Sequence, residues 1–276
     1  MSDRRHFIVI GSMKSGTTSL YQHLLAHPEV AMSRMKETDY FVEDGNWPLG
    51  EEWYNKQFAK DRPVTGEVSP NYSKHDVFPG VPERIAAYNP DTKLIFLARD
   101  PVDRFMSHYR HVSVMGHTDV TPDDLMGSHS GNHILETSRY AAQLETFLKV
   151  FPRDNLLILD FAELKDDPQS TINRVTTFLD LAPLTIGEIA TQNDAQSIAA
   201  MPSFVQRIWR SRLKRRIDPQ ISRGMRDKAR KLLSRGKPKA LPDIPDSLRA
   251  DAAVHLAEDA TQFRTLSGLP FSDWAV

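Results

Sequence analysis

Short apolar runs alternate along the chain with longer segments in which apolar residues recur at helical spacing. The apolar runs are rich in Val, Ile and Leu and have the length of buried strands. They predict strands at Phe7–Ile10, Glu29–Met32, Val64–Val68, Leu94–Ala98 and Leu156–Leu159. The amphipathic segments predict helices near Thr17–Ala26, Glu51–Phe58, Pro82–Tyr88, Pro101–Met115, Ser138–Phe151 and Pro168–Leu179. This alternation is typical of an α/β domain in which helices flank a central, mainly parallel sheet.

Two later stretches depart from this pattern. Gly116–Glu136 combines Gly, Pro, Ser and His without a clear period, so we expect a mobile loop with a functional role. Ser203–Ala240 holds fourteen Lys or Arg against Asp218 and Asp227 only. We expect this basic segment to be mostly helical, either as a solvated face or as a surface for an anionic partner. Asp246–Leu266 then predicts a helix that docks onto the domain.

Composition limits the classes of protein. The 276 residues, 40% of them hydrophobic, suit one domain over residues 1–276, and no linker divides the chain. A net charge of −1 gives no reason to expect nucleic acid, and the absence of cysteine excludes disulfides and thiolate chemistry. No apolar stretch is long enough for a signal sequence or a membrane span, so we expect a cytoplasmic protein. Peripheral contact through the basic segment and the oligomeric state stay open.

The first predicted strand runs directly into a loop that is suited to phosphate. From Gly11 the sequence reads Gly-Ser-Met-Lys-Ser-Gly-Thr-Thr, and a predicted helix follows at once. Backbone amides around the glycines and the positive end of the helix attract an anion. Lys14 adds a cation, while Thr17 and Thr18 add hydroxyl groups. In the loop of nucleotide triphosphate enzymes the lysine directly precedes the Ser or Thr, whereas here Lys14 precedes Gly16.

The order Lys-Ser-Gly-Thr-Thr resembles the 5′-phosphosulfate loop of the sulfotransferases that use 3′-phosphoadenosine 5′-phosphosulfate (PAPS). A second family motif follows the predicted strand Leu94–Ala98, where Arg99 and Ser107 match the Arg and Ser that bind the 3′-phosphate. A guanidinium group suits this role because it can hold a phosphate with two hydrogen bonds. The resemblance implies a PAPS donor, the product PAP, no metal, and nucleotide contacts from Lys14, Ser15, Gly16, Thr17, Thr18, Arg99 and Ser107.

The resemblance extends over nearly the whole chain and is closest to the heparan sulfate and related bacterial branch. The stretches that carry it include Gly66-Glu-Val-Ser-Pro-Asn-Tyr and the closing Gly268-Leu-Pro-Phe-Ser-Asp-Trp. It implies transfer to a hydroxyl or amine group of a carbohydrate or small metabolite, with a lipid also open. In the family a late basic loop closes over the 3′-phosphate. Ser234-Arg-Gly-Lys-Pro-Lys matches it loosely and in inverted order, which makes Arg235 and Lys237 candidates.

Sulfuryl transfer also needs a base for the proton of the acceptor and cations for the leaving oxygens. Lys36-Glu-Thr-Asp-Tyr-Phe resembles the Lys-Glu-x-x-Phe-Phe motif of the heparan sulfate branch, whose glutamate is the proposed base. The resemblance therefore implies Glu37 as the base and Lys14 as the cation at the leaving oxygen. Glu67, beside Ser69, is the alternative carboxylate for the role of the base. Lys36, Glu67 and Ser69 are the candidates for contact with the acceptor.

One active-site cation of the branch is missing from its usual position. Val68 stands where the branch usually has a lysine, and Lys36 or Lys74 could replace it. The histidine pairs His108/His111 and His129/His133 have helical spacing but lie in no convincing metal motif, so we expect no metal site.

Two other functions stay open from the sequence. A P-loop kinase for a small molecule would need a carboxylate for Mg²⁺, for which Asp100 is the available residue, but Lys14 is misplaced for that chemistry. A non-catalytic module that binds PAP or another anion would keep the phosphate loop and lose the base.

Overall fold

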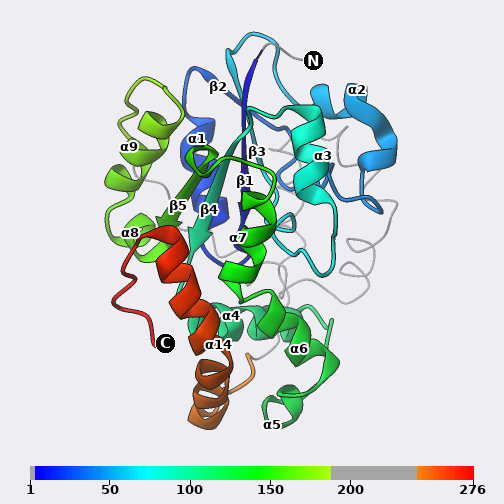
Figure 1. The fold of residues 1–276 in the computed structure, drawn as a ribbon, viewed down its shortest axis with the longest axis vertical. Helices are drawn as coiled ribbons and strands as arrows, with labels where there is room; N and C mark the ends of the chain where they lie inside the picture. Colours follow the sequence, from blue (N-terminus) through cyan, green and yellow to red (C-terminus); the bar gives the residue numbers. More distant parts are fainter. Residues whose placement is uncertain (1–3, 188–240) are drawn as a thin grey trace, which may run out of the picture.

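The computed structural model describes residues 4–187 and 241–276 (Figure 1). Its centre is a parallel sheet with the strand order β2-β3-β1-β4-β5. The strands are β1 (Arg5–Gly11), β2 (Val30–Met32), β3 (Val64–Val68), β4 (Lys93–Ala98) and β5 (Leu156–Asp160). All five were predicted within two residues at each end, and the α/β class with a parallel sheet is confirmed.

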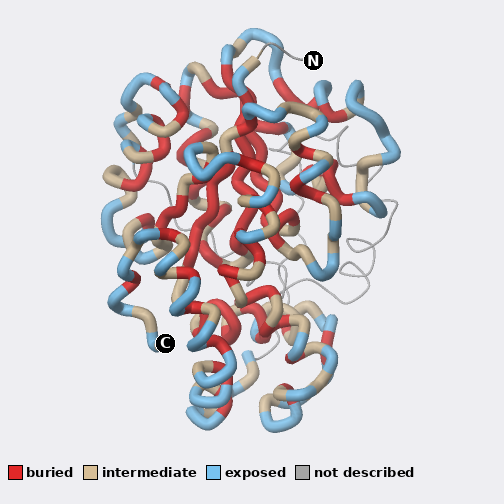
Figure 2. Tube along the Cα trace, in the orientation of Figure 1, coloured by how far each residue is buried: buried red, intermediate tan, exposed pale blue. Residues whose placement is uncertain are grey.

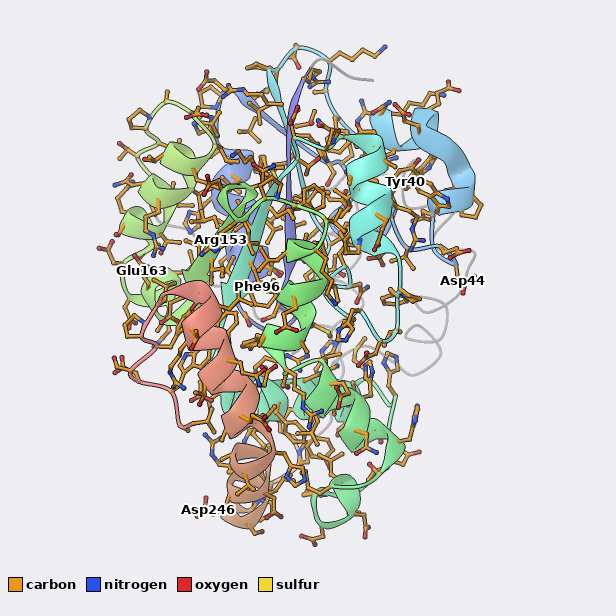
Figure 3. The ribbon with its side chains drawn as sticks, in the orientation of Figure 1. Tyr40, Asp44, Phe96, Arg153, Glu163 and Asp246 are labelled. Atoms are coloured by element: carbon orange, nitrogen blue, oxygen red, sulfur yellow. The ribbon has the colours of Figure 1, made fainter. Side chains whose placement is uncertain are left out.

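Helices cover both faces of the sheet (Figure 1). One face packs against α1 (Thr17–Leu25), α8 (Phe161–Asp166) and α9 (Pro168–Phe178). The other packs against α2 (Gly50–Asn55), α3 (Val81–Tyr88) and α7 (Tyr140–Leu148). Because successive strand residues point to opposite faces, Phe7 and Val9 join the first core, while Ile8 and Ile10 join the second. Phe96, labelled near the centre of Figure 3, is fully buried, and its ring centroid lies 5.4 Å from that of Tyr140.

A third cluster of helices lies beyond the carboxyl ends of the strands. It contains α4 (Pro101–Val114), α5 (Pro122–Leu125), α6 (His129–Glu136) and α14 (Asp246–Ser267). Figure 2 shows the buried positions running through the strands and along the inner sides of these helices. None of the helices in the described ranges is both long and apolar enough to cross a membrane.

The prediction of a mobile loop over Gly116–Glu136 was wrong, because this stretch contains α5 and α6. Ser128 caps α6 by accepting a hydrogen bond from Gly131 N at 3.0 Å. Leu125 and Ile134 are 0% and 1% exposed and pack in the core formed by α4 and α14. The helices are too short to show a period, and part of the surface that buries them comes from α14, more than 100 positions later in the sequence.

The remaining differences are smaller. The helix predicted over Ser138–Phe151 is shorter and runs from Tyr140 to Leu148. The helix predicted to end at Phe58 ends at Asn55. The helix α8 and the 3₁₀ turns η1 (Trp47–Leu49) and η2 (Arg153–Asn155) were not predicted. The basic segment, residues 203–240, lies outside the described residues.

The core position of α6 gives a stability test. Ile134→Ala should lower the free energy of unfolding by about 2–5 kcal/mol, because it leaves a cavity between α6, α4 and α14. Urea denaturation measures this change. Leu49→Ala, at a side chain that is 52% exposed, is the control and should change stability little. If both variants were equally stable, Ile134 would not be part of the core, and Gly116–Glu136 would be a surface loop as the sequence predicted.

Candidate active site

The phosphate loop lies where ligands bind in open α/β sheets. It leaves the carboxyl end of β1, between β3 on one side and β4 on the other, at the point where the strand order reverses. Ser12 N donates to Leu97 O at 2.9 Å, which ties the loop to β4. Gly16 has φ 82° and a Cβ there would lie 2.7 Å from the Phe161 ring, so this position requires glycine. The loop thus presents the amino end of α1 at the edge of the sheet.

The predicted loop residues differ in their accessibility. Lys14 has a left-handed backbone, with φ 74°, and Thr17 and Thr18 form the first turn of α1. The side chain of Ser15 is turned into the loop, so its predicted nucleotide contact would come from the backbone. It is fully buried, and its Oγ lies 2.5 Å from Ser12 Oγ in a hydrogen bond within the loop. Its hydroxyl group shapes the loop and is closed to a ligand.

Arg99 lies beside this loop, as the two sequence motifs require. Its Nη1 donates to Lys14 O at 3.3 Å, and its guanidinium carbon lies 5.2 Å from the centre of the Phe161 ring. Asp103 is 3.7 Å away, and the Arg99 side chain is 25% exposed. Ser107 lies two turns into α4 and is half-buried. Adjacent strands therefore bring together residues that are 85 positions apart.

Sequence reasoning missed Arg104, a buried residue that supports the phosphate loop through a hydrogen bond. Its side chain is fully buried, and Nε donates to Met13 O at 3.1 Å. Burial lowers the pKa of Arg104 to about 10, so the group keeps its charge at neutral pH. Its other hydrogen-bond partners are Ile134 O, Thr137 Oγ1, Ser138 Oγ and His108 Nδ1. The Asp-Pro-x-x-Arg spacing after Arg99 was visible, but nothing in it revealed these partners.

Glu37 lies on the other side of the loop, at the carboxyl end of β3. Its backbone N donates to Val68 O at 2.9 Å, and its side chain is 47% exposed. Lys36 Nζ lies 2.5 Å from Glu37 Oε1. Desolvation raises the pKa of Glu37, but Lys36, together with Lys74 and His111, lowers it below its ordinary value. Glu37 is therefore an accessible, ionised carboxylate at neutral pH.

The burial of Glu67 contradicts its predicted roles as the alternative base and as a contact for the acceptor. It is 0% exposed, and Oε1 accepts from Thr38, Ser69 and Tyr72 at 2.5, 2.5 and 2.7 Å. Tyr54 donates to its other oxygen. Burial raises the pKa of Glu67, and these donors lower it in part. Glu67 and the equally buried Ser69 therefore form an internal hydrogen-bond cluster and cannot touch an acceptor.

The structure also shows where the two lysines that could replace the branch's missing active-site cation lie. Val68 is 0% exposed and packs in the core beside α1, whereas Lys74 reaches the phosphate loop, with Nζ 3.4 Å from Met13 Sδ. Lys36 is held by Glu37.

The histidines at helical spacing lie in different surroundings. Arg104 Nη2 lies 2.8 Å from His108 Nδ1, so this histidine accepts a hydrogen bond, and burial lowers its pKa well below the usual range. The rings of His108 and His133 meet edge to face, with centroids 5.7 Å apart. Burial, followed by Lys14, lowers the pKa of His111 to about 4. Within residues 4–187 and 241–276, no group of three His, Asp or Glu could hold a metal ion.

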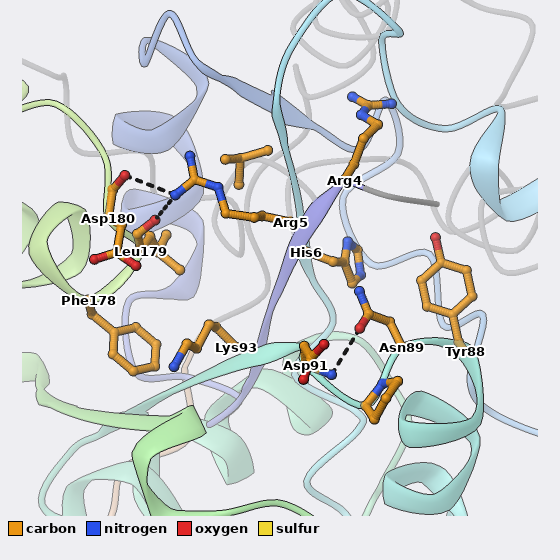
Figure 4. Close-up of a pocket in the computed structure, with 12 residues that line it drawn as sticks. Arg4, Arg5, His6, Tyr88, Asn89, Asp91, Lys93, Phe178, Leu179 and Asp180 are labelled. Atoms are coloured by element: carbon orange, nitrogen blue, oxygen red, sulfur yellow. Dashed lines mark hydrogen bonds between the residues drawn. The ribbon is translucent and has the colours of Figure 1, made fainter. Parts of the chain in front are cut away.

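A separate cavity of about 440 Å³ lies at the amino ends of β1 and β4 (Figure 4). Arg5 donates there to the carbonyl oxygens of Leu179 and Asp180 at 3.0 and 2.9 Å, and Lys93 to that of Asp154 at 3.1 Å. Because it opens at the edge of the sheet opposite the phosphate loop, it is not the transfer site. The two late candidates, Arg235 and Lys237, lie outside the described residues.

A family model described as the sulfotransferase domain matches residues 4–231, and the chain belongs to this family. The bifunctional heparan sulfate N-deacetylase/N-sulfotransferase 4 of Mus musculus is 31% identical over 201 residues, which cover 64% of this chain and 22% of that protein. The heparan sulfate glucosamine 3-O-sulfotransferase 5 of Mus musculus is 31% identical over 188 residues, covering 64% and 53%. The resemblance noted in the sequence is thereby confirmed at the level of the family.

A solved sulfotransferase from Alicyclobacillus acidocaldarius has the same fold, with a TM-score of 0.67 over 100% of both chains at 19% identity. The matched region amounts to only 22% and 53% of the two heparan sulfate relatives. Those relatives are therefore longer proteins, and their names describe activities of the whole chains.

The Glu67 cluster gives a test that separates structure from catalysis. Glu67→Gln should lower the free energy of unfolding by about 1–3 kcal/mol, because an amide cannot accept from all four hydroxyl groups. Urea denaturation measures the loss, with the exposed Glu83→Gln as control. A Glu67→Gln protein of unchanged stability that had lost sulfuryl transfer would make Glu67 the base after all.

Proposed function

We propose that this protein transfers the sulfuryl group of PAPS to a hydroxyl or amine group of an acceptor, and that the acceptor is a carbohydrate. The observation that carries the proposal is the meeting of the phosphate loop with Arg99 at the carboxyl edge of the sheet. This arrangement offers two cradles for anions, one at the amino end of α1 and one at Arg99 and Ser107. PAPS carries one phosphate group at each end of its ribose, which suits two such cradles.

The side chains around the loop suit an in-line transfer. The acceptor atom attacks sulfur, the bond from sulfur to the 5′-phosphate oxygen breaks, and that oxygen keeps the electron pair. Lys14 and the amino end of α1 stabilise the negative charge on this leaving oxygen. The proton of the acceptor goes to the carboxylate of Glu37, which is ionised at neutral pH. The products are the sulfated acceptor and PAP.

The kinase alternative loses support at Asp100. Its Oδ1 accepts from Val102 N and Asp103 N at 2.8 and 2.9 Å, as the cap of α4, and its Oδ2 accepts from Ala275 N at 2.5 Å. A carboxylate used in this way is a poor ligand for Mg²⁺. The non-catalytic alternative loses support from the exposed, ionised Glu37.

The proposed acceptor class rests on the named relatives, both of which act on heparan sulfate. One relative is named as an N-sulfotransferase and the other as a 3-O-sulfotransferase, so both amine and hydroxyl acceptors belong in the first screen. Desulfated heparan sulfate, a lipid alcohol and a phenol, each with radiolabelled PAPS, would test the class directly.

The Arg99 assignment predicts how the protein discriminates nucleotides. PAP should bind much more tightly than 5′-AMP, and Arg99→Ala should remove most of the difference. Losing a charged hydrogen bond to phosphate costs about 1.5–3 kcal/mol, or at least about tenfold in affinity. Titration calorimetry measures both ligands, and Arg110→Ala, an exposed arginine on α4, is the matched control. Equal affinities of the unaltered protein for PAP and AMP would show that the second cradle is misassigned.

Glu37 should separate binding from turnover. Glu37→Gln should keep PAP affinity within about threefold while transfer falls by about 10²–10⁴-fold, because an amide cannot accept the proton. Calorimetry and labelled sulfate transfer measure the two effects. Normal turnover of the Gln variant would exclude Glu37 as the base.

The same residue predicts how activity depends on pH. Since Lys36 and its neighbours lower the pKa of Glu37, the unaltered enzyme should keep its activity until the pH falls below the ordinary range of a glutamate.

A further inference from the structure

Lys74 approaches the phosphate loop from the segment that follows β3. Its Nζ donates to Asn71 Oδ1 at 2.7 Å and lies 3.4 Å from Met13 Sδ in the loop. Both of these acceptors are neutral, so neither cancels the charge of the ammonium group. The side chain is thus held at the loop by contacts with uncharged groups, an arrangement that leaves its charge available to an anion.

A second carboxylate holds this lysine in place through an amide. Asn71 Nδ2 donates to both oxygens of Asp39, at 3.2 and 3.1 Å, while Asn71 Oδ1 accepts from Lys74. The backbone of Asp39 is in the left-handed region, with φ 45°, two residues after Glu37. The contacts Asp39–Asn71–Lys74 therefore link the segment that carries the proposed base to Met13 in the phosphate loop.

Charged groups from different segments of the chain act on Lys74. Burial lowers the pKa of Lys74 to about 8 and Arg104 acts in the same direction, whereas Asp39 and Glu37 oppose them. Burial, followed by Glu37, raises the pKa of Asp39 to about 7. Burial lowers the pKa of His108, His111 and His133, and Lys74 adds to this lowering at each of them.

We propose that Lys74 binds the oxygens of the transferred sulfuryl group, and that Asp39 and Asn71 are the positioning residues that aim it. This inference rests on the proposed function. In the transfer, the acceptor atom bonds to sulfur, the bond to the 5′-phosphate oxygen breaks with its electron pair, and the proton leaves to Glu37. Lys74 changes no bond; its ammonium group stabilises the negative charge on the sulfuryl oxygens between the two partial bonds.

The test compares PAPS with PAP, which lacks the sulfuryl group. Lys74→Met should leave PAP affinity within about threefold, weaken PAPS binding relative to PAP, and reduce labelled transfer to desulfated heparan sulfate by about 10²–10³-fold. Lys93→Met, at the opposite edge of the sheet, is the matched control and should change neither affinity nor transfer. Thermal unfolding checks that each variant is folded.

A pH profile provides a second readout, which a merely structural lysine would not move. In the unaltered protein kcat/KM should fall as the pH rises through about 8, because Lys74 loses its proton. Lys74→Arg keeps its charge and should move this fall to higher pH. Asn71→Ala, which removes the hydrogen bonds between Lys74 and Asp39, should lower kcat by a larger factor than it lowers the affinity for PAP.

The outcomes separate the two proposals. Equal losses of PAP affinity and transfer in Lys74→Met would make Lys74 a support of the loop and overturn the inference, as would unchanged transfer. If Lys74→Met fails to fold, an unchanged pH profile in Lys74→Arg would overturn it. An unaltered protein that binds neither PAPS nor PAP would instead overturn the proposed function itself.

Discussion

The buried guanidinium of Arg104 is the contact on which the rest of the site depends. It joins Met13 in the phosphate loop to Ile134, Thr137 and Ser138 at the end of α6, and it does so with full burial. A charge in that position is tolerated only when its donors are satisfied, so the surrounding carbonyl and hydroxyl groups must keep their places. The packing of α6 in the third core therefore also fixes the shape of the phosphate loop.

The parallel sheet supplies the second constraint. Because β3, β1 and β4 are neighbours, the phosphate loop after β1 and Arg99 after β4 lie at one edge, and Glu37, in the segment after β2, is held beside them by its backbone hydrogen bond to the end of β3. In the proposed function, β1, β4 and α4 form the side that binds the nucleotide, and the segments around β3 form the side that binds the acceptor.

Two carboxylates on the acceptor side are distinguished by their surroundings. Glu67 is buried among four hydroxyl donors, and it organises the core between β3, Tyr54 and Tyr72. Glu37 lies at the edge of the sheet beside Lys36, with a lowered pKa and an exposed side chain. The same functional group thus serves stability in one place and is available for proton transfer in the other.

The sequence by itself determined the features that adjacent residues encode. The strand runs, the Gly-containing loop with Lys14, and the strand end at Arg99 are each written in a few consecutive positions, since apolar period and turn chemistry act locally. Only the tertiary structure decided which polar groups are buried. Nothing near Glu67 in the sequence announces that Thr38 and Tyr54 will saturate it, and the partners of Arg104 lie up to 91 positions away. Burial and hydrogen bonding depend on which segments the sheet brings together, and that is a property of the whole fold.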